Sequence, residues 1–196
     1  MTFDTAEIFP MTAGIGPGDH LGLGGCDAVD LTKEFGTPLY VFDEDTLRAV
    51  CSEFVGEFTG RYPSAKVLYA SKAYIGLALA RLLHEEGLGL DVVSGGELAV
   101  AMTAGVPAED VYFHGNNKSP AELEMALDHG IGRVVVDGFL EIEMLNELAG
   151  ARGMTQDILL RVSPGIDPHT HAKTTTGILD TKFGFSIETG DAEEAV

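Results

Sequence analysis

From residue 66 onward, short apolar runs alternate with longer segments of mixed polarity. Each run is rich in Val, Leu or Ile and predicts a buried strand: KVLYAS (66–71), LGLDVV (88–93), DVYFHG (110–115), RVVVDG (133–138) and DILLRVS (157–163). The segments between the runs predict helices over about 75–86, 95–104, 119–129 and 139–151. Because four of the runs are nearly continuous, we expect a parallel sheet whose two faces are both covered.

The helix over 119–129 carries the clearest local signals. Ser119, Pro120 and Glu122 combine an N-cap serine, a proline in the first helical turn and the glutamate of a capping box. Leu123 and Leu127 then lie on one side of the helix, as an apolar stripe facing a core requires. We therefore expect this helix to begin at residue 119 or 120.

The chain before residue 66 is less regular. We expect residues 1–37 to be loop-rich, ending in a Gly-Thr-Pro turn. PLYVFD (38–43) predicts a short strand, and Asp43 or Asp45 is a candidate cap for a helix over 46–58. The predicted division is an N-terminal segment over 1–37 and a β/α domain over 38–196.

The order of the elements favours an α/β fold of the (β/α)8 TIM-barrel type. Five β units fall within about 100 residues, and no Gly-x-Gly-x-x-Gly turn follows the first of them, as a dinucleotide-binding fold would require. A complete barrel needs eight strands and roughly 250 residues. We therefore expect a barrel truncated to about five β/α units.

Composition narrows the range of partners. The chain has 31 acidic and 12 basic residues and a net charge of −19, which would repel nucleic acid and anionic membranes. Cys26 and Cys51 form neither a metal-type spacing nor a disulfide framework. The N-terminus lacks the pattern of a signal peptide, and no apolar run reaches the ~20 residues needed to cross a bilayer. We expect a soluble cytoplasmic protein.

Polar residues follow the predicted strands at their carboxyl ends, where a β/α barrel carries its active site. They are Lys72, Asp91, His114, Asn116, Asn117, Asp137 and Arg161. Lys72 has two interpretations. It is either a surface lysine whose stem covers apolar neighbours, or an amine held at the barrel mouth for covalent chemistry.

The motif Tyr69-Ala70-Ser71-Lys72-Ala73 resembles the pyridoxal-phosphate lysine motif of the ornithine/diaminopimelate/arginine decarboxylase family of fold type III. The resemblance continues, in the family's order and spacing, through most of the chain. It includes GG (24–25), GTPLYV (36–41), DVVSGGEL (91–98), HGNNKS (114–119), RVSPG (161–165), TG (176–177) and KFG (182–184). Tyr74 is a small departure, since the family more often has Asn, Cys or Phe there.

The resemblance implies a PLP-binding barrel with pyridoxal 5'-phosphate held on Lys72. Within the family the motifs are most similar to those of enzymes that decarboxylate meso-2,6-diaminopimelate to L-lysine, a small-molecule amino-acid substrate. The resemblance also implies a homodimer, with the segment 1–37 packed on a C-terminal β-domain. That β-domain and the family's phosphate loop are absent from the 196 residues, so we interpret the chain as an N-terminal portion.

The resemblance assigns Ala70, Asp91, Arg161 and His114 to the cofactor site, and alternatives remain for three of them. Asp91 lies near the cofactor or caps a helix. Arg161 lies inside the barrel or forms a salt bridge at its rim. The side chain of His114 faces the mouth or satisfies loop backbone.

Two other segments suggest binding sites that we do not favour. Ser94-Gly95-Gly96 could cradle a phosphate at a helix N-terminus, but the family binds phosphate with later segments. His169 and His171 are spaced like metal ligands, but nothing near them in the sequence completes a set, so no metal is expected.

Rival functions remain open. They are a related decarboxylase of ornithine, arginine or carboxynorspermidine, a barrel racemase using the same lysine, and a non-catalytic regulatory protein derived from the fold.

Overall fold

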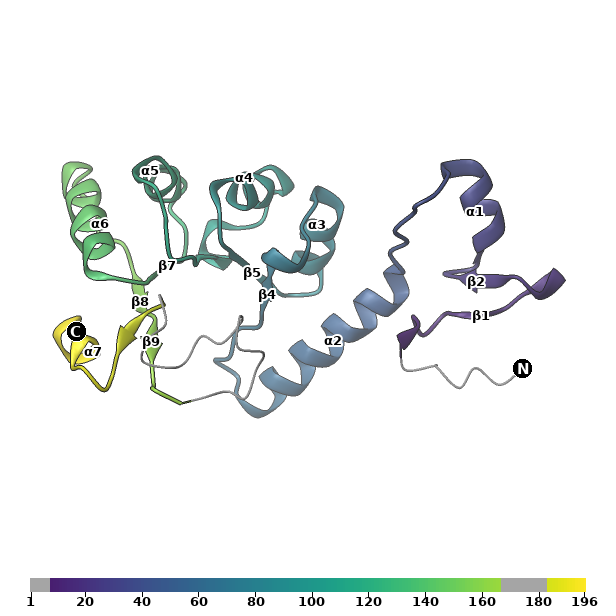
Figure 1. The fold of residues 1–196 in the computed structure, drawn as a ribbon, viewed down its shortest axis with the longest axis horizontal. Coiled ribbons are helices and arrows are strands. Elements are labelled where there is room, and N and C mark those ends of the chain that lie inside the picture. The colour runs from purple at the N-terminus through teal and green to yellow at the C-terminus, as the bar shows by residue number, and fades with distance from the viewer. Residues whose placement is uncertain (1–7, 167–182) are drawn as a thin grey trace. The chain divides into compact units, whose positions relative to one another are not determined.

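The computed structural model describes residues 8–166 and 183–196 (Figure 1). The chain divides into two compact units, Met1–Val67 and Leu68–Val196, and each is described by itself. The sequence predicts a boundary between residues 37 and 38. In the structure, the first compact unit extends further and includes helix α2 (Glu44–Arg61).

The first unit contains more regular structure than the loop-rich segment that the sequence predicts. Strands β1 (Gly14–Ile15), β2 (Leu21–Leu23) and β3 (Cys26–Asp27) form an antiparallel sheet in that order. Helix α1 (Ala28–Phe35) follows, and the Asp27 carboxylate caps it by accepting the backbone N–H groups of Val29 and Asp30. The strands are too short to leave a period-2 pattern in the sequence, which explains why the prediction missed them.

The predicted strand over 38–43 is wrong. Residues 38–43 join α1 to α2 and pair with no strand of the described sheets. An apolar run becomes a strand only when a partner takes its backbone groups, and here the Tyr40 side chain is 90% exposed. The cap prediction is resolved in favour of Asp43, which accepts the Thr46 N–H and the Thr12 hydroxyl.

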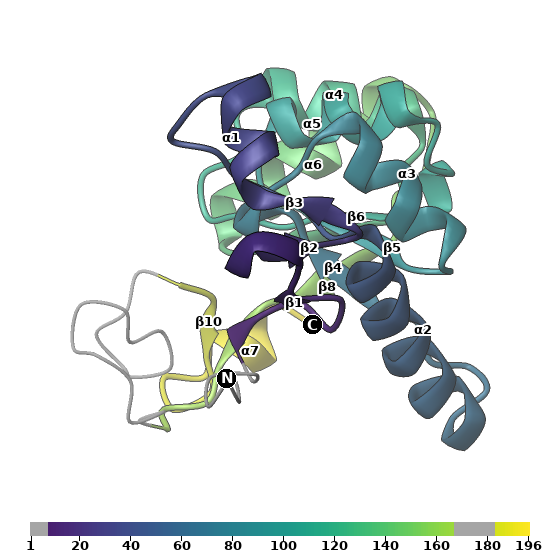
Figure 2. The same cartoon turned by 90° about the vertical axis from the view of Figure 1, so that its right-hand side faces the viewer.

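The second unit confirms the β/α prediction. A parallel sheet runs in the order β4-β5-β6-β7-β8, with strands at Leu68–Ala70, Gly89–Val92, Val111–Phe113, Arg133–Val136 and Ile158–Leu160. The helices that follow successive strands are α3 (Leu77–Glu85), α4 (Gly95–Ala104), α5 (Pro120–His129) and α6 (Phe139–Ala151). They lie in a row on one side of the sheet (Figures 1 and 2).

The strand register separates two faces. Leu90, Val92, Phe113 and Val134 are completely buried, as expected of the face that the helices cover. The other face of the sheet is only partly buried. It carries Asp91 of β5, Tyr112 of β6 and Arg133 of β7, which are partners in the strand register. The prediction that both faces are covered is therefore wrong for the described residues, because the described helices of this sheet lie on one side.

The predicted strand over 157–163 is divided at Arg161. The first part is β8, and the second is β9 (Val162–Ser163), which pairs in parallel with β10 (Phe185–Ser186). The short helix α7 (Asp191–Glu194) ends the chain. Strand β10 was not predicted, because two residues give no pattern by themselves.

Candidate active site

The carboxyl ends of the five parallel strands carry the polar residues predicted from the sequence. Lys72 follows β4, Asp91 is the third residue of β5, His114 follows β6, Asp137 follows β7 and Arg161 follows β8. In a β/α barrel this edge forms the mouth of the active site. This edge is called the carboxyl edge from here on.

Lys72 lies in a single 3-10 turn, Ser71–Ala73, that begins directly after β4. The turn is fixed at its base, since the Tyr69 hydroxyl donates a hydrogen bond of 3.0 Å to the Tyr74 carbonyl. Ser71 points inward and is 1% exposed, whereas Lys72 is exposed. The Lys72 amine has no hydrogen bond or ion pair with another of the described residues.

Asp91 lies beside the lysine turn. It is opposite Ala70 in the β4–β5 register, and its Oδ2 lies 3.5 Å from His114 Nδ1. It does not cap a helix, because the Ser94 hydroxyl fulfils that role for α4. The helix-cap alternative for Asp91 is therefore wrong.

The pair of Asp91 and His114 has two atoms without partners. Asp91 Oδ1 and His114 Nε2 are both buried and form no hydrogen bond within the described chain. Leaving a buried polar atom unpaired is unfavourable by roughly 1–3 kcal/mol, so such atoms mark a place where a ligand or water binds. The His114 backbone N–H donates to the Val92 carbonyl at 2.7 Å, which fixes the start of the loop after β6.

Gly115 permits the sharp turn after His114. Its φ of +112° is a conformation that residues with a side chain rarely adopt, and a Cβ there would lie 3.2 Å from the Val93 carbonyl oxygen. The turn keeps His114 close to β5.

Glu122 joins the starts of helices α4 and α5. Its carboxylate accepts the N–H groups of Gly95, at 2.7 Å, and of Ser119, at 2.9 Å. The hydrogen bond from the Ser119 N–H, followed by that from the Gly95 N–H, lowers the pKa of Glu122. The Gly95 N–H at this helix N-terminus is therefore already occupied by a side chain of the protein.

Arg161 has a carboxylate and an aromatic ring as neighbours. Its guanidinium donates a hydrogen bond of 2.8 Å to Asp137 Oδ1 and lies 4.2 Å from the centre of the Phe183 ring. The salt-bridge alternative for Arg161 is thus observed. The Arg161 side chain remains 24% exposed although it is paired, so it is still accessible at the carboxyl edge.

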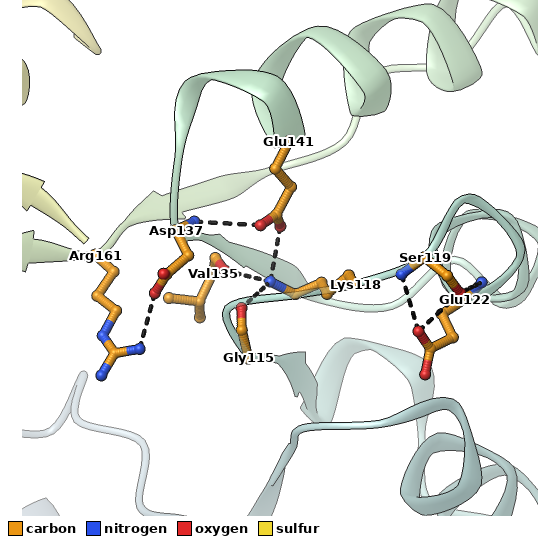
Figure 3. Close-up of polar contacts among 8 residues, drawn as sticks. All are labelled: Gly115, Lys118, Ser119, Glu122, Val135, Asp137, Glu141 and Arg161. Atoms are coloured by element: carbon orange, nitrogen blue, oxygen red, sulfur yellow. Dashed lines mark hydrogen bonds and ion pairs between the residues drawn. The ribbon is translucent and has the colours of Figure 1, made fainter. Parts of the chain in front are cut away.

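A buried lysine lies behind these residues, and the sequence analysis did not assign it a role (Figure 3). Lys118 Nζ donates to Glu141 Oε1 at 2.7 Å, to the Val135 carbonyl at 2.7 Å and to the Gly115 carbonyl at 2.8 Å. Burial lowers the pKa of Lys118, and the Glu141 carboxylate opposes that shift. Glu141 Oε2 in turn accepts the backbone N–H of Asp137 at 3.3 Å.

The described residues contain neither a metal-binding cluster nor a membrane-spanning helix. Across 8–166 and 183–196, no group of three His, Cys, Asp or Glu side chains is placed to hold a metal ion. His169 and His171 lie outside the described residues. None of the described helices is long and apolar enough to cross a membrane.

Comparison with known families identifies the fold and its chemistry. The sequence profile of the family described as "Pyridoxal-dependent decarboxylase, pyridoxal binding domain" matches residues 47–196. The chain belongs to this family of pyridoxal-dependent decarboxylases. The resemblance noted in the sequence is thereby confirmed, and so is the barrel fold, here present in part.

Two curated relatives of the chain are diaminopimelate decarboxylases. The chain is 50% identical over 177 residues to the diaminopimelate decarboxylase of Bacillus subtilis, covering 90% of this chain and 40% of that protein. It is 48% identical over 189 residues to the diaminopimelate decarboxylase of Actinosynnema pretiosum, covering 96% and 41%. The chain thus spans about two fifths of the length of these relatives.

A solved structure shares the same arrangement of elements. The diaminopimelate decarboxylase of M. jannaschii, in complex with L-lysine, superposes with a TM-score of 0.83 at 36% identity. The match covers 94% of this chain and 43% of that one. The more distant lysine/ornithine decarboxylase of Vibrio vulnificus, at 23% identity and a TM-score of 0.53, shares the fold alone.

The residues at the carboxyl edge of this pyridoxal-dependent decarboxylase domain fit its cofactor. Lys72 supplies an unpaired amine for an aldehyde, and Asp91 Oδ1 and His114 Nε2 are buried atoms whose partners are missing from the described chain. The donor set is therefore suited to pyridoxal 5'-phosphate. Arg161, on the same edge, adds a cation.

Proposed function

We propose that this chain is the pyridoxal-binding part of a diaminopimelate decarboxylase, which converts meso-2,6-diaminopimelate to L-lysine and carbon dioxide. The observation that carries the proposal is the identity of 48–50% to diaminopimelate decarboxylases over 90% or more of the chain, together with an unpaired lysine at the carboxyl edge. In the reaction, the bond between the α-carbon and its carboxylate breaks, carbon dioxide leaves, and a proton takes its place.

Each residue of the edge has a distinct part in the proposal. When bound, pyridoxal 5'-phosphate withdraws electrons from the carbon that loses the carboxylate. Lys72 holds the cofactor covalently, and its amine is suited to this because no described residue engages it. Asp91 Oδ1 stabilises positive charge near Lys72, since Asp91 lies opposite Ala70, the strand residue two positions before Lys72.

The remaining residues orient and line the site. His114 holds Asp91 through Nδ1 and directs Nε2 to the cofactor. Arg161 provides a fixed positive charge, held in place by Asp137. Ala70 ends β4 opposite Asp91, so it lines the site beside that carboxylate.

The proposal extends to the assembly, the location and the domain division of the protein. We propose a homodimer, acting in the cytoplasm, in which residues 1–37 pack with a C-terminal β-domain and residues 38–196 form part of the barrel. Sedimentation of the full-length gene product, read through to its stop codon, tests the dimer.

Substrate choice is tested by carbon dioxide release from the same full-length product. We expect meso-diaminopimelate to react much faster than ornithine or arginine, because a site that pairs the distal amine and carboxylate leaves buried polar groups unmatched by the other substrates. Equal or faster reaction of ornithine would reassign the protein to a related decarboxylase. Racemisation without carbon dioxide release would indicate a racemase. A protein that binds the cofactor but catalyses no reaction would be a regulatory protein.

A further inference from the structure

Lys118 is a buried charge that the proposed reaction does not use. The residue is 6% exposed, and all three hydrogens of its ammonium group have acceptors among the described residues. Burying an ion pair gives little net stability, because desolvation offsets the attraction between the charges. Stability alone therefore does not account for the buried pair of Lys118 and Glu141.

The contacts of Lys118 lead in two directions, both of which end at the candidate site (Figure 3). In one direction, Nζ binds the carbonyl of Gly115, the residue directly after His114. In the other, Nζ binds Glu141, which accepts the backbone N–H of Asp137. Asp137 in turn accepts a hydrogen bond from Arg161.

Along the second direction, two cations enclose two carboxylates. Lys118 and Arg161 are cations at the two ends, and Glu141 and Asp137 are carboxylates between them. These four charged residues connect the loop before α5, the first turn of α6 and the ends of β7 and β8. The loop before α5 carries His114, and the end of β8 carries Arg161. The Lys118 ammonium group is therefore linked to both of these site residues.

We infer that Lys118 is a positioning residue for cofactor binding: through Gly115 it fixes the turn that carries His114, and through Glu141 and Asp137 it fixes Arg161. The inference rests on the proposed function, because it assumes that both residues face pyridoxal 5'-phosphate. Lys118 itself contacts neither cofactor nor substrate, since its three hydrogens are occupied.

The test separates positioning from stability with two variants of the full-length protein. Lys118→Met removes one charge and leaves Glu141 buried and unpaired, which lowers the melting temperature. Lys118→Met combined with Glu141→Met removes both charges, and such replacements of buried ion pairs are often neutral or stabilising. The double variant therefore recovers stability, but it has lost the links to Gly115 and Asp137. If the single variant does not fold, the double variant alone decides.

Cofactor affinity is measured by titrating each protein with pyridoxal 5'-phosphate and following its absorbance. We expect the Kd of the double variant to rise about tenfold, the lower range for loss of a group that orients a ligand, although its melting temperature is restored. Arg152→Met is the control, because it breaks ion pairs with Glu124 and Asp128 on the outer helices and should leave the Kd unchanged.

Two outcomes would overturn the inference, and they differ. Wild-type affinity in a stable double variant means that Lys118 only stabilises the fold, and the proposed function survives. Absence of cofactor binding by the wild-type protein contradicts the proposed function itself, and the inference falls with it.

Discussion

At the scale of single residues, three of the four buried side-chain polar atoms without partners in the described chain lie at or next to the candidate site. Asp91 Oδ1, His114 Nε2, Ser71 Oγ and His129 Nε2 are the side-chain atoms of this kind in the described part of the chain. Asp91, His114 and Ser71 lie at or next to the carboxyl edge. His129 is the last residue of α5 and lines a cavity between α4 and α5. The two histidines therefore form a matched pair, one at the candidate site and one remote from it.

The first prediction compares these two histidines. His114→Phe should weaken binding of pyridoxal 5'-phosphate by about tenfold, because it removes both the contact with Asp91 and the free Nε2; one hydrogen bond to a charged group contributes about 1.5–3 kcal/mol. His129→Phe should leave the affinity unchanged. Absorbance titration of the full-length variants gives both values. Equal affinities for the two variants would remove His114 from the site.

The second prediction concerns Asp137 and Arg161. Asp137→Asn keeps the shape of the side chain and its oxygen acceptor but removes the charge opposite the guanidinium. We expect weaker cofactor binding, by about threefold to tenfold, with a modest change in melting temperature, because Asp137 is 5% exposed whereas the Arg161 side chain, at 24%, still reaches water. A lower melting temperature without a change in cofactor affinity would show that the pair serves stability alone.

At the scale of elements, the best-defined link is the one that Glu122 makes between α4 and α5. The capping box of Ser119 and Glu122 fixes the start of α5, and the same carboxylate holds the Gly95 N–H at the start of α4. The ends of β5 and β6 lead into these two helix starts. A local capping motif thus also sets the distance between two units of the sheet.

The third prediction is that Glu122→Gln lowers the free energy of unfolding by about 1–2 kcal/mol, the range for loss of a cap together with a charged hydrogen bond. Urea denaturation measures the change. Glu124→Gln, on the same helix, weakens only a 3.9 Å ion pair with Arg152 and should cost less than about 0.5 kcal/mol. An equal cost for the two variants would contradict the linking role of Glu122.

The pH dependence of this effect follows from the lowered pKa of Glu122. A carboxyl group whose pKa is lower in the folded state contributes stability that is complete above its unfolded pKa, about 4.3. The contribution is lost as the pH falls through the folded-state pKa. The difference between wild type and Glu122→Gln should therefore be constant near neutral pH and shrink below about pH 4.

The sequence predicts those elements whose signals are local. The five strands, helices α3 to α6 and the cap at Ser119 follow from apolar runs and neighbouring residues. It fails where the partner is distant in sequence. Residues 38–43 have the composition of a strand without a partner, and β10 is a strand only because β9 pairs with it. Lys118 is buried beside a glutamate 23 positions away, which no local pattern reveals.

The same contrast holds for the candidate site. The positions of Lys72, Asp91, His114 and Arg161 follow from the rule that working residues lie at the carboxyl ends of barrel strands. Their pairing does not. That Arg161 binds Asp137 and that His114 contacts Asp91 depends on side-chain geometry across neighbouring strands.

At the scale of the whole molecule, large apolar side chains remain on the surface of each unit. In the first unit, Phe54 and Phe58 of α2 are 53% and 50% exposed. In the second, Leu159 lies 45% exposed on β8, which is an edge strand of the five-stranded sheet. Exposed apolar groups beside an open strand edge favour association with other chains.

The fourth prediction is that the 196 residues, expressed alone, associate or aggregate and do not release carbon dioxide from diaminopimelate. The chain spans about two fifths of its relatives, and its exposed apolar groups have no cover within the described residues. Size-exclusion chromatography and a carbon dioxide assay on the same preparation test both parts. A discrete monomer with enzyme-like turnover would show that these residues suffice for fold and function.

The central claim is that Lys72 holds the cofactor, and one measurement tests it most directly. The full-length protein is incubated with pyridoxal 5'-phosphate, reduced with borohydride so that the cofactor stays on its amine, digested and analysed by mass spectrometry. We predict the adduct on Lys72, because it is the described lysine that directly follows a strand of the parallel sheet and has no partner there. Adduct on Lys33, Lys66 or Lys118 instead, or no adduct at stoichiometric cofactor, would contradict the account.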